Sequence, residues 1–203
     1  MFDLPTDLPA DLVPLSWLIG VWEGTGVIDY TVGETRYTGE FAHRVSFSHD
    51  GGAFLNYSAD AWYLEGSGES QTRTRLVSEV GYWRLARPAT AQDAGPGLLP
   101  AIEPSVVRTA DDVEALRNGE AGFDIEVLLA HSDGVSELYL GQVRGPRIDL
   151  ATDFVARTAT AKEYAAASRM YGLVDAHLLW AWDIAALGQE LGSHASARLA
   201  RAE

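Results

Sequence analysis

The segment from Leu15 to Tyr30 constrains the fold more than any other part of the chain. Within it, Gly20, Trp22, Gly24 and Gly26 fall at every second position. Alternate residues of a β-strand share one face, so a large indole lies among positions that have no side chain. Such glycines indicate a sharp bend or a close backbone approach. The pattern predicts a strand over residues 17–30 that bends as a sheet closes into a barrel, with Trp22 filling the closed end. A glycine-rich turn between two ordinary strands is the alternative that the spacing leaves open.

Strand-like segments recur along the rest of the chain. Alternating or aromatic apolar stretches, separated by turn residues, cover residues 37–48, 53–64, 72–86, 123–130, 135–144, 147–156, 162–174, 178–186 and 194–201. Many short strands with little helix favour an all-β fold over a βαβ architecture. We therefore predict an antiparallel β-barrel of about ten strands, which is wide enough to hold a ligand.

Two segments interrupt this rhythm. Residues 1–14 are an ordered lead-in at most, and Asp11 is placed to cap a short helical turn that ends at Trp17. Residues 88–121 are rich in proline and alanine. A structureless loop of that length is unusual within a compact domain. We interpret it as a partly disordered surface insertion between two strands, with a short helix over residues 111–118. Because the strand pattern resumes unchanged beyond it, residues 1–203 are predicted to form a single domain rather than two domains joined by a linker.

Composition narrows the function classes. A net charge of −14 argues against nucleic acid or an anionic membrane as the main partner. The chain has no cysteine, which excludes disulfides, thiolate-ligated haem, iron–sulfur clusters and cysteine nucleophiles. Six Trp, eight Tyr and six Phe favour strands or an aromatic-lined pocket. We find no secretory signal and no apolar run of membrane-spanning length, so we expect a cytoplasmic protein.

Few residues stand out as candidates for chemistry. The carboxylates show no readable acid–base pair, and we interpret them as a solvated face. His131 and His177 lie beside turn residues and are predicted to be exposed and without a role. His43 and His49 are six residues apart, a spacing that would place both on one strand face and gives a minor indication of a metal site. His194 begins the last strand. A neutral imidazole is the usual proximal ligand of haem iron, but a surface histidine fits the same position.

Several stretches, in order and over nearly the whole chain, resemble the nitrobindin family of small β-barrels that bind ferric haem b. The first is the Gly-x-Trp-x-Gly-x-Gly pattern from Gly20, which lipocalins and fatty-acid-binding proteins share loosely. The others are Phe41-Ala-His43, Ser78-Glu79-x-Gly81-Tyr82, residues 126–131 with Gly134 and Glu137, residues 160–163 followed by Arg169-x-Tyr171, and a closing strand with His194, Ala197, Leu199 and Arg201.

The resemblance implies a function and a site. His194 matches the axial ligand of the haem iron, and Lys162 falls where a haem-contacting lysine is expected. One ferric haem b per chain would bind small ligands such as peroxynitrite and nitric oxide, and the implied activity is the isomerisation of peroxynitrite to nitrate. Family members often carry a histidine on the distal side where this chain has Val77. Without that imidazole, stabilisation of a bound anion must come from elsewhere or be weaker.

Other readings stay open at this point. The same barrel could carry a fatty acid or another small apolar ligand without any metal, in which case His194 is incidental. A barrel that serves mainly as an assembly surface is a third option. The oligomeric state is also open, with a homodimer as one possibility.

Overall fold

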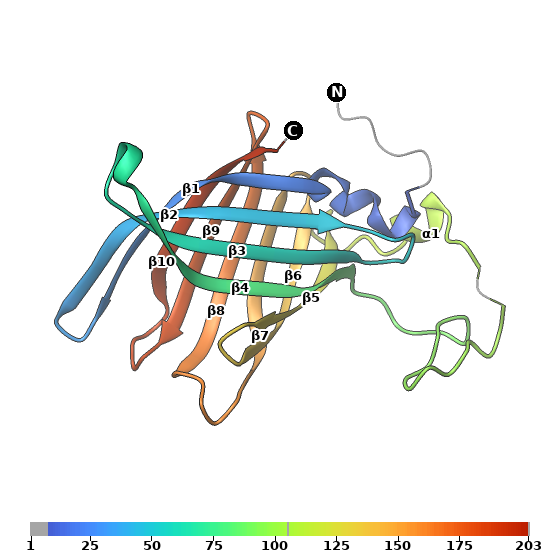
Figure 1. The fold of residues 1–203 in the computed structure, drawn as a ribbon. Coiled ribbons are helices and arrows are strands. Elements are labelled where there is room, and N and C mark those ends of the chain that lie inside the picture. The colour runs from blue at the N-terminus through green and yellow to red at the C-terminus, as the bar shows by residue number, and fades with distance from the viewer. Residues whose placement is uncertain (1–7, 105, 203) are drawn as a thin grey trace.

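The computed structural model describes residues 8–104 and 106–202, in which ten strands form one closed barrel (Figure 1). Each strand pairs antiparallel with its neighbour along the chain, and β1 pairs with β10 to close the ring. The predicted all-β barrel is therefore confirmed. The strands are β1 (Gly20–Val32), β2 (Thr35–Ser48), β3 (Leu55–Glu65), β4 (Thr72–Leu85), β5 (Phe123–His131), β6 (Val135–Arg144), β7 (Arg147–Arg157), β8 (Tyr164–Val174), β9 (His177–Ala186) and β10 (Gly192–Arg201).

The glycines of β1 let two strands approach closely. β1 runs without interruption from Gly20 to Val32, so the alternative of a glycine-rich turn is wrong. A Cβ atom at Gly24 would lie 2.3 Å from the carbonyl oxygen of Arg198, and one at Gly26 would lie 2.3 Å from that of Ser196. Only glycine fits at these positions because the backbone of β10 occupies the space that a side chain would need.

A short helix closes one end of the barrel. The 3₁₀ helix η1 (Ala10–Leu18) buries three leucines against the core, and the fully buried Trp22 donates a 2.7 Å hydrogen bond from Nε1 to the carbonyl oxygen of Leu18. Because this helix continues to Leu18, the first strand begins at Gly20 rather than at residue 17. Asp11 does not cap the helix, since Pro9 occupies the N-cap position. Its buried carboxylate instead lies 3.9 Å from Arg87 Nε and 3.7 Å from Arg108 Nη1.

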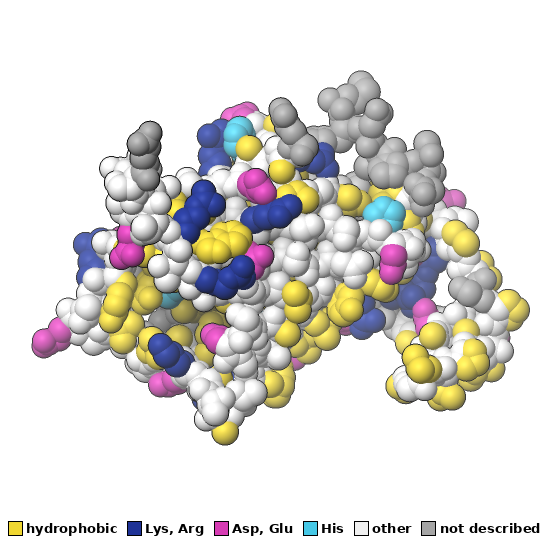
Figure 2. Space-filling model, in the orientation of Figure 1, with side chains coloured by type: hydrophobic (Ala, Val, Ile, Leu, Met, Phe, Trp, Pro, Cys, Tyr) yellow, Lys and Arg dark blue, Asp and Glu magenta, His cyan; other side chains and the backbone are white. Residues whose placement is uncertain are grey.

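The segment between β4 and β5 lies at this same end. Figure 1 shows it looping away from the barrel before α1 (Ala110–Glu114) returns beside η1. Thr109 caps α1 in a reciprocal capping box with Asp112, so the helix starts one residue before the predicted 111–118 segment and ends earlier. Figure 2 shows hydrophobic side chains on the surface of the projecting segment. Leu98, Ile102 and Val107 are among its exposed residues.

The interior follows the strand period of two. Inward-facing residues of successive strands form one continuous core, for example Val45, Trp83, Val127, Tyr139 and Tyr171. A second short 3₁₀ turn, η2 (Gly68–Ser70), lies in the β3–β4 connection. Across residues 8–104 and 106–202, none of the helices has the length and apolar content needed to cross a membrane.

Candidate functional site

A cavity lies at the end of the barrel opposite η1. It is lined from the end of β1, the start of β4, the β7–β8 loop and the β9–β10 turn, and its volume is about 340 Å³. Its walls are mainly apolar and aromatic, with Phe41, Trp180 and Trp182 among them. A predominantly apolar cavity with a few convergent polar groups is typical of a small-molecule site.

His194 reaches this cavity because of an irregularity in β10. Ser193 pairs with Asp183 and Ala195 pairs with Trp182, so His194 is the extra residue of a β-bulge. Downstream, Ala197 and Leu199 face the interior. Strict alternation would therefore turn His194 outward, yet both His194 and Ala195 line the cavity. The bulge re-aims the imidazole into the barrel.

The surroundings of His194 keep its imidazole neutral. Its ring stacks on Tyr30 with centroids 3.8 Å apart and planes at 22°, and it meets Trp182 edge-on at 5.7 Å. Burial against these rings lowers the pKa of His194 to about 4. A neutral imidazole with a free lone pair at pH 7 is the form that ligates a metal.

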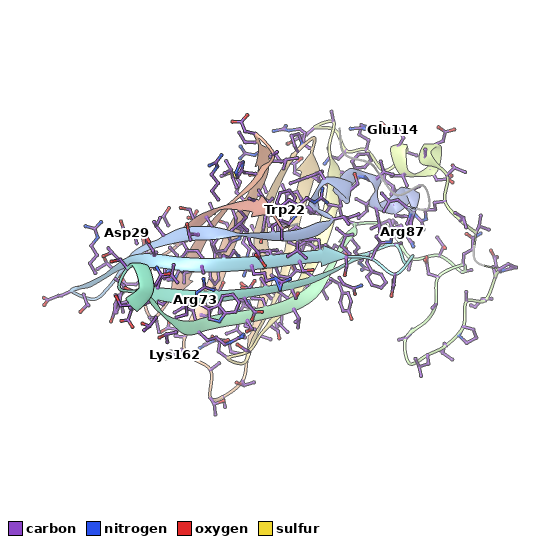
Figure 3. The ribbon with its side chains drawn as sticks, turned by 45° about the horizontal axis from the view of Figure 1, so that its top comes forward. Trp22, Asp29, Arg73, Arg87, Glu114 and Lys162 are labelled. Atoms are coloured by element: carbon purple, nitrogen blue, oxygen red, sulfur yellow. The ribbon has the colours of Figure 1, made fainter. Side chains whose placement is uncertain are left out.

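Lys162 lies at the rim of the cavity. The strand predicted over residues 162–174 begins two residues later, at Tyr164, so Lys162 belongs to the β7–β8 loop. Its backbone carbonyl accepts a 3.0 Å hydrogen bond from Arg157 Nη1, while its exposed side chain lines the cavity. Figure 3 shows Lys162 far along the barrel from Trp22, which marks the closed end. Among the described residues, no carboxylate forms an ion pair with its amine.

Val77 lines the same cavity and is half-buried. Its side chain offers neither a donor nor an acceptor, so this part of the wall has no imidazole. This is the position at which the family resemblance implies a distal histidine in other members.

The structure separates His43 from His49. His49 lies beyond the end of β2 at Ser48, and only His43 lines the cavity. The even spacing misleads because the strand ends between the two residues. Within the described part of the chain, no three His, Cys, Asp or Glu residues gather to hold a metal ion.

His43 is nevertheless a buried polar group of the cavity. Its Nδ1 atom lies 3.1 Å from the carbonyl oxygen of Asp60, to which it donates, and its Nε2 atom has no hydrogen-bond partner in the described structure. Its ring packs on Trp180 at 4.9 Å. Burial lowers the pKa of His43, so its imidazole is neutral and its Nε2 atom carries a lone pair.

A buried ionic cluster joins the cavity wall to the core. The guanidinium of Arg169, whose side chain is fully buried, donates to both oxygens of Glu79 at 2.8 and 2.7 Å and to Glu137 at 3.3 Å. Glu137 also accepts hydrogen bonds from Tyr139 at 2.7 Å and Tyr164 at 2.6 Å. The interpretation of the carboxylates as a solvated face is therefore wrong for Glu79 and Glu137.

His131 belongs to this cluster, and the prediction that it is exposed and without a role is wrong. Its Nε2 atom lies 2.6 Å from Glu137 Oε2 and 3.6 Å from Glu79 Oε1. Burial lowers the pKa of His131, but the hydrogen bond to Glu137 and the charge of Glu79 outweigh it, and the pKa is raised. For the carboxyl group of Glu79, burial acts in the opposite direction and raises the pKa. The charge and hydrogen bonds of Arg169 outweigh burial and lower the pKa of Glu79 to about 2.

Glu79, His131, Glu137 and Arg169 are each in phase with core residues of their strand. His131 follows Val127 and Leu129 at the strand period, and Arg169 lies between Ala167 and Tyr171. A charged residue on the core face of a strand was the signal that could have identified the cluster. His177, by contrast, is half-buried beside a turn outside the cavity, where its Nδ1 atom lies 3.1 Å from Arg198 Nη2.

The residues that line the cavity are of the kinds that could hold a haem group. The neutral imidazole of His194 projects into it as a potential iron ligand, and aromatic walls could cover the faces of a porphyrin. The buried Nε1 atoms of Trp180 and Trp182 lack protein partners in the described structure, as does Nε2 of His43. Lys162 at the rim could pair with a carboxylate of such a group.

Comparisons with known proteins agree with this geometry. Residues 11–201 match the model of a family described as THAP4-like, heme-binding beta-barrel domain. The chain is 63% identical to a peroxynitrite isomerase of Leifsonia xyli subsp. xyli and 56% identical to one of Clavibacter michiganensis subsp. michiganensis, in both cases over 100% of each chain. It also resembles the crystal structure of Rv2717c from M. tuberculosis, with a TM-score of 0.66 and 27% identity, over 99% of this chain and 100% of that one.

Proposed function

Because the chain belongs to the family of THAP4-like, heme-binding β-barrel domains, the nitrobindins, we propose that it is a haem protein that isomerises peroxynitrite to nitrate. We further propose one ferric haem b per chain, with nitric oxide binding as a related property. The full-length similarity to peroxynitrite isomerases supports the reaction and does not favour a metal-free carrier of apolar ligands.

The observation that carries the proposal is the neutral imidazole of His194 inside the cavity. The bulge at Ser193–Ala195 turns it inward, and burial keeps it unprotonated at pH 7. We therefore assign His194 as the residue that would ligate the iron. A ferric haem, when bound, supplies the Lewis-acid and one-electron chemistry of the reaction.

The other residues bind and orient the group. The walls formed by Phe41, Trp180 and Trp182 would exclude water from the porphyrin, and Lys162 is placed to pair with one of its carboxylates. Val77 leaves that part of the wall apolar. Gly24 and Gly26 act indirectly, because they let β10, which carries His194, approach β1.

A hemin titration tests the assignment. The purified protein should give a Soret band that sharpens up to one equivalent of hemin, and His194→Ala should lose this band while far-ultraviolet circular dichroism still reports the barrel. His177→Ala is the matched control, since His177 lies outside the cavity. A normal haem spectrum in His194→Ala would refute His194 as the ligand.

The activity needs its own measurement. Haem-loaded protein should accelerate peroxynitrite decay in stopped-flow experiments and shift the product toward nitrate, whereas haem-free protein should not. Equal rates and nitrate yields in both would refute the isomerase proposal. The single-domain organisation of residues 1–203, supported by the family match over 11–201, and a cytoplasmic location remain parts of the proposal.

A further inference from the structure

His131 lies on the wall of the cavity opposite His194. Around the closed ring of ten strands, β5 and β10 are five steps apart in either direction, so the two imidazoles come from opposite walls. Both rings approach Trp182, whose ring centroid lies 6.2 Å from that of His131 and 5.7 Å from that of His194. The two imidazoles can therefore be no further apart than these two separations together. Both residues line the same cavity.

His131 also stands beside the apolar position Val77. Val77 and Glu79 lie two residues apart on β4 and both line the cavity, and Glu79 pairs directly with His131 on β5. Side chains that are diagonal neighbours across two strands lie within reach of one another. The imidazole of His131 is thus on the wall where Val77 supplies no polar group.

His131 has a ring nitrogen that the buried ionic cluster does not use. The fully buried guanidinium of Arg169 is committed to the cluster, with Nε donating to Tyr139 at 2.9 Å and the terminal nitrogens donating to the two glutamates. The imidazole of His131 meets Glu137 through Nε2 alone. Its Nδ1 atom has no hydrogen-bond partner in the described part of the chain, so it is available to a molecule in the cavity.

The charges of the cluster favour the protonated form of this imidazole. Arg169 balances only one of the two carboxylates, Glu79 and Glu137, that it contacts. Burial lowers the pKa of His131, but the hydrogen bond to Glu137 and the charge of Glu79 raise it above the ordinary value of 6.5. In the protonated ring both nitrogens carry hydrogen, so Nδ1 is a donor. In the neutral ring the proton stays on Nε2 beside the Glu137 carboxylate, and Nδ1 can only accept.

We propose that His131 binds the anionic ligand of the site, donating a hydrogen bond from Nδ1 while Nε2 remains paired with Glu137. This inference rests on the proposed function, in which an iron held by His194 has its open position on the side away from that residue. Hydrogen bonds from a charged donor to an anion are stronger than those between neutral groups. The site would therefore favour peroxynitrite and other small anions over neutral ligands.

The second buried imidazole of the cavity does not have this property. His43 donates from Nδ1 to the carbonyl oxygen of Asp60, and burial keeps its ring neutral, so its Nε2 atom can only accept. It therefore provides a comparison for His131 within the same cavity.

Fluoride binding to the haem-loaded protein tests the proposal. Fluoride is a small anion, and absorbance reports its affinity for ferric haem without any turnover. His131→Gln keeps a donor toward Glu137 but cannot become a cation, so its fluoride affinity at pH 6 should be lower by about tenfold or more. His43→Gln is the matched control and should bind fluoride as the native protein does. Equal affinities in the native protein and His131→Gln, or equal losses in the two variants, would overturn the inference.

The native protein provides a second test that needs no variant. Nitric oxide is a neutral ligand, so the ratio of fluoride affinity to nitric oxide affinity cancels effects of pH on the iron itself. The groups whose charge or titration acts on His131 are, by element, Glu79 on β4, Asp133 in the β5–β6 turn, Glu137 on β6, and Tyr164 and Arg169 on β8. The ratio should decline as the pH rises from 6 to 9, because His131 then loses its charge and its Nδ1 donor. A constant ratio would overturn the inference.

The same samples separate this inference from the proposed function. Each protein is first titrated with hemin, and a Soret band that saturates at one equivalent shows that the haem site is intact. A normal band with unchanged fluoride affinity in His131→Gln would refute only the inference. A native protein that gives no such band would refute the proposed function, and the inference would fall with it.

Discussion

Replacing Arg169 with methionine should strongly destabilise the barrel. Methionine fills similar space but leaves Glu79 and Glu137 without their buried cation. Removing one partner of a buried ion pair costs about 3–5 kcal/mol of unfolding free energy. The pKa of Glu79 gives the same scale, since its fall from 4.5 to about 2 corresponds to about 3 kcal/mol of interaction with its surroundings.

Urea unfolding at pH 7, followed by far-ultraviolet circular dichroism at matched haem content, measures this loss. Arg84→Met is the matched control, because Arg84 forms an exposed pair with Glu126. An exposed pair contributes about 0–1 kcal/mol. A loss below about 1 kcal/mol for Arg169→Met, or a loss equal to that of the control, would refute the reasoning.

The pH dependence of unfolding provides a second check on Arg169→Met. In the folded protein the pKa of Glu79 is about 2 and its ordinary value is 4.5, so its stabilising contribution is complete above pH 4.5 and is lost as the pH falls toward 2. At pH 3.5 that contribution has fallen by about 1 kcal/mol. In the variant, Glu79 is buried without Arg169, so its pKa is raised above the ordinary value. Protonation at low pH then removes the cost of burying an unpaired carboxylate. The difference in unfolding free energy between the two proteins should narrow from pH 7 to pH 3.5; a constant difference would contradict this account.

Two further predictions concern the strand contact and the imidazole. Gly24→Ala should destabilise the protein by about 1–3 kcal/mol in the same urea assay, because its Cβ atom meets the β10 backbone at 2.3 Å. Gly119→Ala is the control and should leave the unfolding free energy unchanged, because a Cβ atom there meets nothing within 4 Å. Equal losses of unfolding free energy in the two variants would contradict the close-approach argument. Because burial lowers the pKa of His194 to about 4, the haem affinity measured by absorbance should hold as the pH falls from 7 to 5 and decline below about 4. A loss of haem affinity with its midpoint near pH 6.5 would show that His194 is not desolvated.

The barrel could be predicted from sequence because its strands alternate strictly where they are half-buried. Residues 37–48 illustrate this: Phe41, His43, Val45 and Phe47 all face the interior, as their spacing requires. The helix η1 could not be placed with the same accuracy, since its short apolar run also fits the start of a strand.

The candidate site could be predicted only in part. The family resemblance predicts His194 as a haem ligand, but the alternation of its own strand points it outward, and no residue pattern reveals the bulge that turns it inward. The ionic cluster was missed for a different reason. Its members lie far apart in sequence, and only the closed sheet brings Arg169 on β8 next to Glu79 on β4.

The two ends of this barrel are separate enough to change independently. Asp11 of η1 lies close to Arg87 and Arg108, which flank the projecting segment, so this segment is anchored at the end opposite the cavity of His194. Its length and composition can therefore drift, or acquire a tethering role, without obstructing the mouth where small molecules enter. The long β4–β5 connection can therefore vary on its own, while the short turns at the opposite end of the barrel shape the opening of the His194 cavity.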